Sequence, residues 1–472
     1  MKRSEIGRLF GVGLLATAML AGFTACSGGG GTTTQPSATA SGTGGGATGG
    51  GTAACDNTIP ADKASLPQVT VWAWYPAFEP VVDLFNKNHT DVQICWTNAG
   101  QGNGEYDRFT TAIQAGTGAP DVIMLEFEVL NSYVVQNALV DLTKYGINDI
   151  KSQFTAGAWK DASAGAGVFA VPVDGGPMGL LVRQDIFDKY NVKVPTTWDE
   201  FATAAQQLKD AGYPGWITDW PSNGESQLSA LYEQANGGAS GFTFDASNPT
   251  QLGINFNTAG TKKVQQYWYD LIKKGVVAND DAGTTDYTTK MVDGTFASYI
   301  SAAWGPGYLA GASGGSPDAK WKAVPLPQWD PANPVMVNWG GSSFAVTAQS
   351  KQPDVAAKVA MAIYGDMDSW KIGVEQAALF PTYLPMLTSD YFKTLPYPFF
   401  NGQQINNDVF LAAGQGYTGV VYSPFTPYVR TQLTQANAAM MQGATSPDAT
   451  IDALQATLVQ YAQEQGFTVT TS

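Results

Sequence analysis

Residues 165–201 read GAGVFAVPVDGGPMGLLVRQDIFDKYNVKVPTTWDEF and place strand, turn and helix signals in close succession. The apolar run FAVPV predicts a strand that ends at Asp174 and two glycines. Further on, Thr197 and Glu200 form a capping box, a pair that satisfies free backbone N–H groups where a helix begins. Four apolar residues then recur at helical spacing, namely Phe201, Ala204, Ala205 and Leu208. This stretch therefore indicates a protein that alternates strands and helices.

The same alternation opens the folded part of the chain. Five segments follow one another there as strand, helix, strand, helix and strand: QVTVWAW (68–74), PAFEPVVDLFNKNH (76–89), DVQICW (91–96), EYDRFTTAIQAGTG (105–118) and PDVIMLE (120–126). Consecutive strands joined by helices pair in parallel, because a parallel pair needs a long crossover connection. Further helices are expected over 264–272, 353–364 and 447–465. The sequence thus predicts an α/β fold without a solenoid repeat.

Composition bounds the function. The chain has 472 residues, of which 44% are hydrophobic, enough for a large core and for two or more domains. Its formal net charge of −15 argues against a nucleic-acid partner. The single histidine, His89, lies in the polar run NKNHTD and is expected in a solvated turn. A catalytic triad would have to use this histidine, so none is expected. No cysteine and histidine set has zinc-site spacing, and neither a metal nor another cofactor is expected.

The N-terminal segment carries export signals. Lys2, Arg3 and Arg8 precede residues 9–25, which hold no charge and are shorter than the roughly 20 residues of a spanning helix. With Cys26 at its end, the segment resembles a bacterial lipoprotein signal, although Phe23 stands where leucine is usual. That resemblance implies a signal peptide over 1–25, a diacylglyceryl group on Cys26, and a protein held at the outer face of the cell membrane. The alternative is an ordinary cleaved signal with an incidental cysteine.

A flexible tether is expected after Cys26. Residues 27–54 contain only glycine, serine, threonine, alanine, glutamine and proline, which cannot form a core. We therefore assign 26–65 to the anchor and tether. Cys55 and Cys95 form an even pair, and such pairs are normally bridged outside the cell. The predicted disulfide closes a loop of about 40 residues, worth on the order of 3–4 kcal/mol.

Several motifs together resemble one family. Within 165–201, the matching residues are Phe169, Ala170, Val171, Pro172, Pro177, Phe187, Pro195, Thr197, Trp198, Asp199, Glu200 and Phe201. Further matches follow in order at 115–126, 137–145, 292–309 and 323–364. They resemble the family-1 extracellular solute-binding proteins of ABC importers, the group that includes maltose-binding protein. Val182 and Arg183 depart from that family's Tyr-Asn pair, and the resemblance covers roughly residues 66–470.

The resemblance implies a periplasmic-binding-protein-like fold with two α/β lobes, a hinge of crossing strands and a ligand cleft between the lobes. Lobe 1 would comprise 66–175 and 340–385, and lobe 2 would comprise 176–339 and 386–472. It also implies a monomeric, non-enzymatic receptor that captures a carbohydrate, in particular an oligosaccharide, and delivers it to the membrane permease of an ABC importer.

The candidate ligand-binding residues follow the predicted strands, because ligands of open α/β sheets bind beyond the carboxyl ends of strands. They are Trp74, Tyr75, Glu126, Asp174, Asp219, Trp220, Trp304, Trp339 and Gly340. Tyr383 is added on family position alone. Indole and phenol rings cover the apolar face of a sugar, carboxylates accept from its hydroxyls, and glycine permits close approach. Trp74, Asp174, Trp304 and Trp339 are favoured for the cleft, whereas the core remains an equal alternative for Tyr75, Glu126, Asp219 and Trp220.

Two other functions remain open from the sequence. Paired acids and aromatic residues would also suit a surface glycoside hydrolase, although no (β/α)₈ succession is present. The cleft could instead bind another polar solute, such as a polyol, an amino sugar or a peptide. Fold alone does not decide between these ligands.

Overall fold

The computed structural model describes residues 55–221, 225–280, 285–314 and 320–471. Contacts divide the chain into Met1–Cys55 and Asp56–Ser472, and the second unit holds the helices and strands given below. The expected signal peptide, Cys26 and most of the tether lie outside the described residues. Among the described residues, none of the helices combines the length and apolar character needed to cross a membrane.

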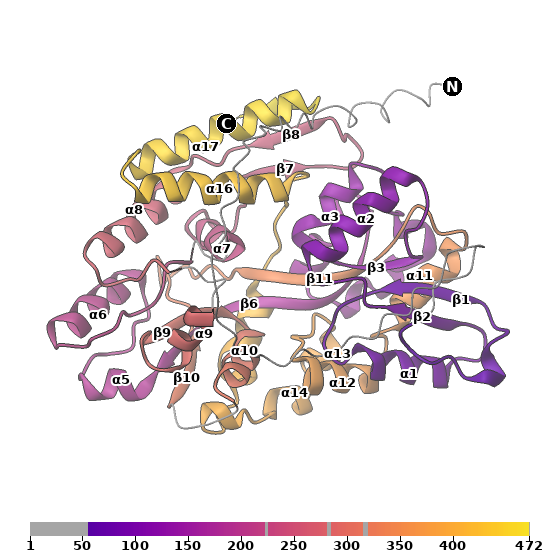
Figure 1. Cartoon of the computed structure of the whole chain (residues 1–472), viewed down its shortest axis with the longest axis horizontal. Helices are drawn as coiled ribbons and strands as arrows, with labels where there is room; N and C mark the ends of the chain where they lie inside the picture. Colours follow the sequence, from indigo (N-terminus) through magenta and orange to yellow (C-terminus); the bar gives the residue numbers. More distant parts are fainter. Residues whose placement is uncertain (1–54, 222–224, 281–284, 315–319, 472) are drawn as a thin grey trace, which may run out of the picture. The chain divides into compact units, whose positions relative to one another are not determined.

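A seven-stranded mixed sheet organises this unit, in the order β10-β6-β11-β3-β1-β2, with β9 paired to β6 (Figure 1). Its strands are β1 (Gln68–Trp72), β2 (Gln93–Thr97), β3 (Val122–Glu126), β6 (Val171–Arg183), β9 (Ser298–Ala302), β10 (Trp321–Pro325) and β11 (Asn338–Val346). The strand β1 pairs in parallel with both β2 and β3, as predicted, and β11 pairs antiparallel with β3 and β6.

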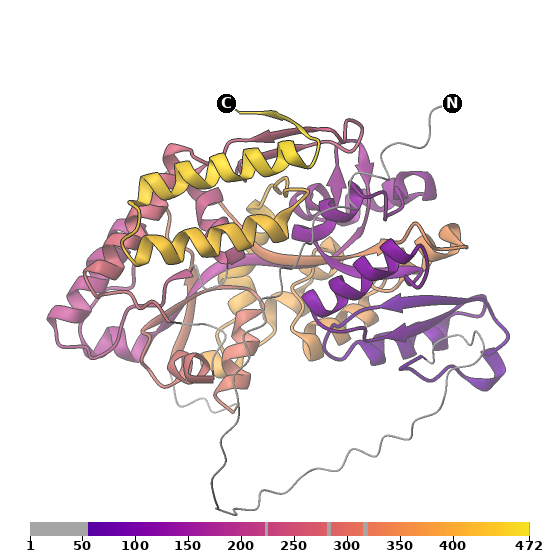
Figure 2. The same ribbon diagram turned by 45° about the horizontal axis from the view of Figure 1, so that its top comes forward.

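Strand β6 is long enough to serve two parts of the sheet. Its first half pairs with β11, and its second half, from Met178 onward, pairs with β9 and β10. Figures 1 and 2 show β6 and β11 running together between the helices on either side. The expected lobe boundaries, after residues 175 and 339, fall inside β6 and β11. The division into two lobes stays a prediction.

The helices of the first part of the chain form where apolar spacing predicts them. In α1 (Phe78–Asn88), the predicted stripe of Phe78, Val81, Val82 and Phe85 is buried. At α6 (Trp198–Asp210), the Thr197 hydroxyl accepts from the backbone N–H of Glu200, as the capping box requires. The Glu200 carboxylate instead accepts from Thr196, one residue earlier than expected. The other helices up to residue 312 are α2 (Asn103–Ala115), α3 (Phe127–Val134), α4 (Ala156–Asp161), α5 (Gln184–Lys189), α7 (Glu225–Ala235), α8 (Ala259–Lys273), α9 (Thr285–Val292) and α10 (Gly305–Ala312).

The C-terminal helices return to elements formed earlier in the chain. Helices α16 (Thr426–Met441) and α17 (Pro447–Glu464) pack on each other, with α16 also against α7 and α17 against α8 (Figure 2). A small sheet in the order β12-β8-β7 adjoins α17. The remaining α-helices and strands of the described residues are β4 (Ser163–Ala164), β5 (Gly167–Val168), β7 (Phe242–Phe244), β8 (Gln251–Ile254), α11 (Pro353–Ala362), α12 (Met367–Ala377), α13 (Leu384–Leu387), α14 (Asp390–Thr394), α15 (Leu411–Gly416) and β12 (Thr468–Thr470).

The core divides into two apolar clusters, and the alternation of β3 explains why. Ile123 and Leu125 belong to one cluster, whereas Val122 and Met124 belong to the other. Successive side chains of a strand point to opposite faces, so the sheet separates the two clusters. Its two faces are therefore both buried.

The predicted disulfide is confirmed, since Cys55 and Cys95 are disulfide-bonded. Residues after Cys55 extend this attachment along the edge strand β2. The Asp56 N–H donates to the Trp96 carbonyl at 2.8 Å, and the Asn57 amide donates to the Ile94 carbonyl at 3.1 Å. These bonds satisfy backbone groups that an open sheet edge would leave unpaired.

Candidate ligand-binding site

Strand ends meet at one edge of the large sheet. Glu126, the last residue of β3, lies opposite Ser342 of β11, and Gly341 lies opposite Gly175 of β6. The ends of β1 and β3 are therefore adjacent to the bulged start of β11 and to the glycine pair of β6. This register brings the segments of Trp74, Glu126, Asp174 and Gly340 close together. Trp74 and Glu126 lie at the carboxyl ends of β1 and β3, as predicted. The strand ends predicted before Asp174 and before Trp339 are wrong, because β6 continues through Asp174 to Arg183 and β11 begins at Asn338.

Trp74 and Glu126 are joined by a residue that the sequence reasoning missed. The Tyr106 ring of α2 packs edge-on against Trp74, with 5.5 Å between ring centroids. Its hydroxyl donates to the Glu126 carboxylate at 2.9 Å. Trp74 and Glu126 are half-buried, so each keeps an accessible part. Together they offer an indole beside a carboxylate, the combination that suits a sugar ring.

A second aromatic group lies where β9 and β11 approach each other. The Trp304 and Trp339 ring centroids are 4.6 Å apart, and the Trp304 indole N–H donates to the Trp339 carbonyl at 3.3 Å. Tyr308, which is 62% exposed, adds a third ring 5.3 Å from Trp304. Gly340 adopts a φ of +75° beside this group. Such a φ favours glycine, and glycine has no side chain that would block the approach to the two half-buried indoles.

Asp174 is tied to the backbone rather than free. Its carboxylate accepts from the Phe380 N–H at 2.6 Å, which fastens β6 to the returning segment 380–382. Burial raises the pKa of Asp174 to about 8, and the nearby Glu126 carboxylate adds to the rise. Tyr75 is buried and shares a hydrogen bond with Ser342 at 2.7 Å. Both residues thus support the sheet edge.

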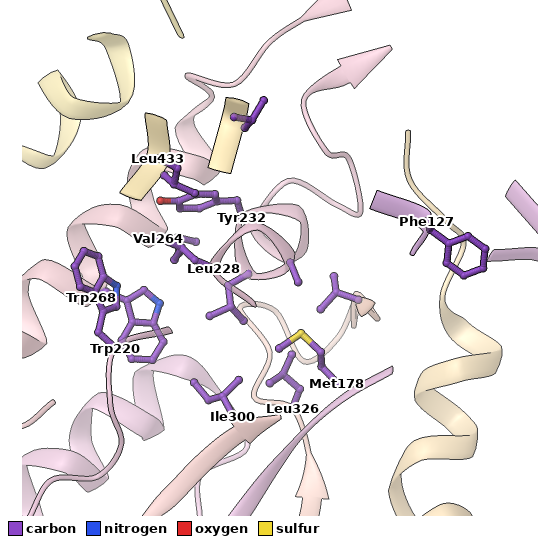
Figure 3. Packing of buried hydrophobic residues seen from close by; sticks show 14 of the residues in the cluster. Phe127, Met178, Trp220, Leu228, Tyr232, Val264, Trp268, Ile300, Leu326 and Leu433 are labelled. Atoms are coloured by element: carbon purple, nitrogen blue, oxygen red, sulfur yellow. The ribbon is translucent and has the colours of Figure 1, made fainter. Parts of the chain in front are cut away.

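The other three candidates have different surroundings. Asp219 accepts from the Asp280 N–H at 2.9 Å. Trp220 is 2% exposed and belongs to an apolar cluster, as Figure 3 shows. Tyr383 packs between other rings, with centroids 5.9 Å from Phe154 and 6.2 Å from Trp370. A ligand role for Asp219, Trp220 and Tyr383 stays a prediction.

A partly open cavity of about 60 Å³ lies between α3, α7, α16 and the segment 422–423. Its wall includes Tyr232 and Leu433, which Figure 3 shows among the buried side chains. The other lining residues are Glu128, Ser229, Glu233, Asn236, Ser240, Phe242, Phe256, Thr261, Asn338, Tyr422, Ser423, Thr426, Val429 and Arg430. Arg430 and Glu128 form an ion pair on this wall. Sequence reasoning missed the cavity, because helices far apart in the chain build it rather than strand ends.

Acidic and phenolic groups gather around this cavity. Burial raises the pKa of Tyr422, and the carboxylates of Asp161, Glu233 and Glu126 raise it further. Burial likewise raises the pKa of Glu233 well above its usual value. Because Glu126 influences both Tyr422 and Asp174, the cavity and the sheet edge belong to one electrostatic neighbourhood. Within the described residues, no cluster of cysteine, histidine and acidic side chains could hold a metal ion.

The chain is similar to known proteins in sequence and in fold. A family model described as bacterial extracellular solute-binding protein matches residues 73–366. The arabinooligosaccharide-binding protein of Bacillus subtilis is 23% identical over 64% of this chain and 70% of its own length. An uncharacterized lipoprotein of Streptomyces antibioticus is 29% identical over 36% of this chain. The alignment spans only 39% of that lipoprotein's length.

Solved structures show the same fold. The ABC transporter-associated binding protein of Bifidobacterium animalis subsp. lactis, in complex with β-1,6-galactobiose, is 28% identical with a TM-score of 0.72. The galacto-N-biose/lacto-N-biose I-binding protein of Bifidobacterium longum, in complex with lacto-N-biose, is 22% identical with a TM-score of 0.74. Each match covers 86% of this chain and 100% of the other. The fold is therefore the mixed α/β, periplasmic-binding-protein-like fold that the sequence predicts.

Proposed function

The chain belongs to the family of bacterial extracellular solute-binding proteins of ABC transporters, and from this premise we propose that it captures an oligosaccharide for a membrane permease. The family is non-catalytic, so the chain is not an enzyme and the hydrolase alternative is set aside. Family membership does not identify the solute. We infer that the residues at the sheet edge determine which solute binds.

The paired indoles of Trp304 and Trp339 carry the carbohydrate assignment. Two half-buried rings at one edge of the fold offer flat apolar faces, and sugar rings present matching C–H faces. Trp74 and Glu126, both in contact with Tyr106, add an indole and a carboxylate that suit a sugar ring. Similar proteins point the same way, since the 28% identical structure is a complex with β-1,6-galactobiose.

We assign the ligand contacts at the sheet edge to Trp74, Glu126, Trp304, Trp339 and Gly340. Asp174 would act mainly by fastening β6 to segment 380–382, since its carboxylate already accepts a backbone hydrogen bond. For Tyr75, Asp219, Trp220 and Tyr383, a ligand role would require side chains now packed or bonded within the protein to rearrange.

We also propose that a lipid on Cys26 holds the receptor at the outer face of the cell membrane. The similarity to a Streptomyces lipoprotein supports this assignment. Two acyl chains anchor a protein stably, and residues 27–54 would give it reach toward the permease. Replacing Cys26 by alanine should release the protein from the membrane fraction without altering solute binding. Retention of the variant on membranes would contradict the anchor.

A thermal-shift screen tests the solute class, because a ligand that binds only the native state raises the unfolding midpoint. The panel contains β-1,6-galactobiose, lacto-N-biose and arabinotriose, together with polyols, amino sugars and peptides. At a ligand concentration of about 100 times Kd, the stabilisation amounts to about 2.7 kcal/mol. We expect a neutral oligosaccharide to give the largest shift. A shift from a peptide or a polyol alone would support the alternative of another polar solute.

A further inference from the structure

Two buried polar side chains face the cavity between α3, α7 and α16 without partners among the described residues. Glu233 is 6% exposed and Asn338 is 7% exposed. Both line the cavity, and among the described residues neither side chain has a hydrogen bond or an ion pair. Other polar lining residues differ, since Tyr232 donates to Gln265 and Ser240 donates to the Val421 carbonyl. The unmet hydrogen bonds are thus confined to a few positions on the wall.

Burying a polar side chain without a hydrogen-bond partner lowers the free energy of unfolding. A buried polar group without a partner forfeits its hydrogen bonds to water, and native proteins keep few of them. A leucine at either position would avoid that cost. Because Glu233 and Asn338 line a cavity, a molecule bound there can complete their hydrogen bonds.

The cavity limits what that occupant is. A volume of about 60 Å³ corresponds to about four to six water positions, at roughly 10–15 Å³ each. This space matches one ring with its hydroxyls rather than a chain of rings. Apolar side chains complete the wall, namely Phe242, Phe256, Val429 and Leu433. Apolar walls with a few unpaired polar groups are typical of small-molecule sites.

The charges around Glu233 favour an uncharged occupant. Arg430 is the cation among the described lining residues, and it is already paired with Glu128. Asp161 contributes a further carboxylate that raises the pKa of Glu233. Burial raises the pKa of Glu233 well above its usual value and so favours the neutral form, in which the carboxyl group both donates and accepts a hydrogen bond. Lys160 is a second cation near Glu233, but it does not line the cavity and its ammonium group donates to the Gly419 carbonyl at 2.8 Å. Among the described lining residues, a ring that carries its own carboxylate would therefore meet no cation other than the paired Arg430.

We propose that this cavity is the subsite for one uncharged ring of the captured sugar, and that Glu233 and Asn338 select that ring. The inference rests on the proposed function and extends it, since it names the buried subsite and the charge of its occupant. Glu233 acts as a neutral hydrogen-bonding group and not as an anion. Glutamine, which also donates and accepts, can replace it, whereas leucine cannot.

Isothermal titration of the purified protein with β-1,6-galactobiose, lacto-N-biose and arabinotriose tests the subsite. The variants are Glu233→Gln, Glu233→Leu and Asn338→Leu. The matched control is Glu79→Leu, at an exposed position of α1. We expect Glu233→Gln to bind within about threefold of wild type, and both subsite leucine variants to lose at least tenfold in affinity. The unfolding midpoint without sugar should rise in the two subsite leucine variants, because an unpaired polar group is removed.

The outcomes separate the two proposals. If none of the three sugars binds wild type while another solute class does, the proposed function fails and the subsite with it. If a sugar binds wild type and Glu233→Leu equally well, the subsite fails and the function stands. If Glu233→Gln loses as much affinity as Glu233→Leu, Glu233 acts as an anion and its neutral role is overturned. A lowered midpoint in both leucine variants would mark a structural role instead.

The groups that face Glu233 allow a pH test of the same claim. They are Lys160 and Asp161 of α4, Tyr232 of its own helix, Tyr417 and Tyr422 of the adjoining segment, and the Glu128–Arg430 pair. Sugar affinity of wild type should fall at alkaline pH as Glu233 ionises, whereas Glu233→Gln should fall less. An equal decline in both proteins would contradict the neutral role.

Discussion

Replacing Glu105 by glutamine should stabilise the protein at neutral pH. Glu105 lies in the first turn of α2 and is fully buried, and neither of its carboxyl oxygens has a hydrogen-bond partner among the described residues. Burial raises its pKa from 4.5 to about 9, against a small opposing effect of Arg108. The folded protein therefore holds this carboxyl group neutral at pH 7, whereas the unfolded chain ionises it.

The sign and size of the effect follow from this difference. Between pH 4.5 and pH 9 the folded state binds one more proton than the unfolded state, so stability falls as pH rises. Each pH unit costs about 1.4 kcal/mol, which amounts to about 3 kcal/mol at pH 7 relative to pH 4.5. Glutamine has nearly the same shape and never ionises. The Glu105→Gln variant should thus gain about 3 kcal/mol at pH 7 and almost nothing at pH 4.5.

Urea unfolding at pH 4.5 and pH 7 measures both values. The exposed Glu79→Gln variant is the control, and it should show no comparable pH-dependent gain. If Glu105→Gln is equally or less stable than wild type at pH 7, the carboxylate has a partner that the structure does not show. If its gain is the same at both pH values, ionisation is not the cause.

Three further changes have defined outcomes. Gly176→Ala should strongly destabilise the protein, because a Cβ there would lie 1.9 Å from the Trp339 carbonyl oxygen across β6 and β11. Thermal unfolding measures that loss. Serine at Cys55 and Cys95 should remove about 3–4 kcal/mol of stability in urea unfolding, because the loop between them is then unconstrained. Trp304→Ala should weaken oligosaccharide binding at least tenfold by calorimetry while changing the unfolding midpoint little, because the indole is half-buried at the sheet edge.

A different result would contradict each of these three predictions. Gly104→Ala is the control for Gly176→Ala, since its added Cβ would meet nothing within 4 Å. Equal midpoints for the two alanine variants would contradict the close approach of β6 and β11. Unchanged stability after removal of both cysteines would mean that the bridge does not constrain the unfolded chain. Unchanged sugar affinity in Trp304→Ala would remove the aromatic surface from the binding site.

Local sequence patterns predict much of the fold, because helix caps and the apolar faces of helices depend on residues close together in the sequence. The spacing of Phe78, Val81, Val82 and Phe85 specifies the buried face of α1, and the Thr197 cap specifies where α6 begins. The parallel pairing of β1, β2 and β3 follows from the helices between them. The disulfide followed from cysteine number and compartment.

The site was predictable only in part. The end of β3 at Glu126 follows from the sequence pattern, whereas Asp174 lies within β6, which continues through the two glycines to Arg183. Strand ends do not predict which way each side chain points, and Trp220 therefore lies in the core although it follows a strand-like segment. Glu233 on α7 and Arg430 on α16 line the same cavity although nearly 200 residues separate them in the sequence, and no local pattern connects them. Long-range packing alone builds that cavity.

Calorimetric titration of the purified protein with neutral oligosaccharides, followed by recovery of the sugar, measures whether the protein binds such a sugar without cleaving it. We expect a saturable isotherm with one site per chain for at least one neutral oligosaccharide, which is recovered intact. No saturable binding of any such sugar, together with saturable binding of a peptide or a charged solute, would contradict this expectation.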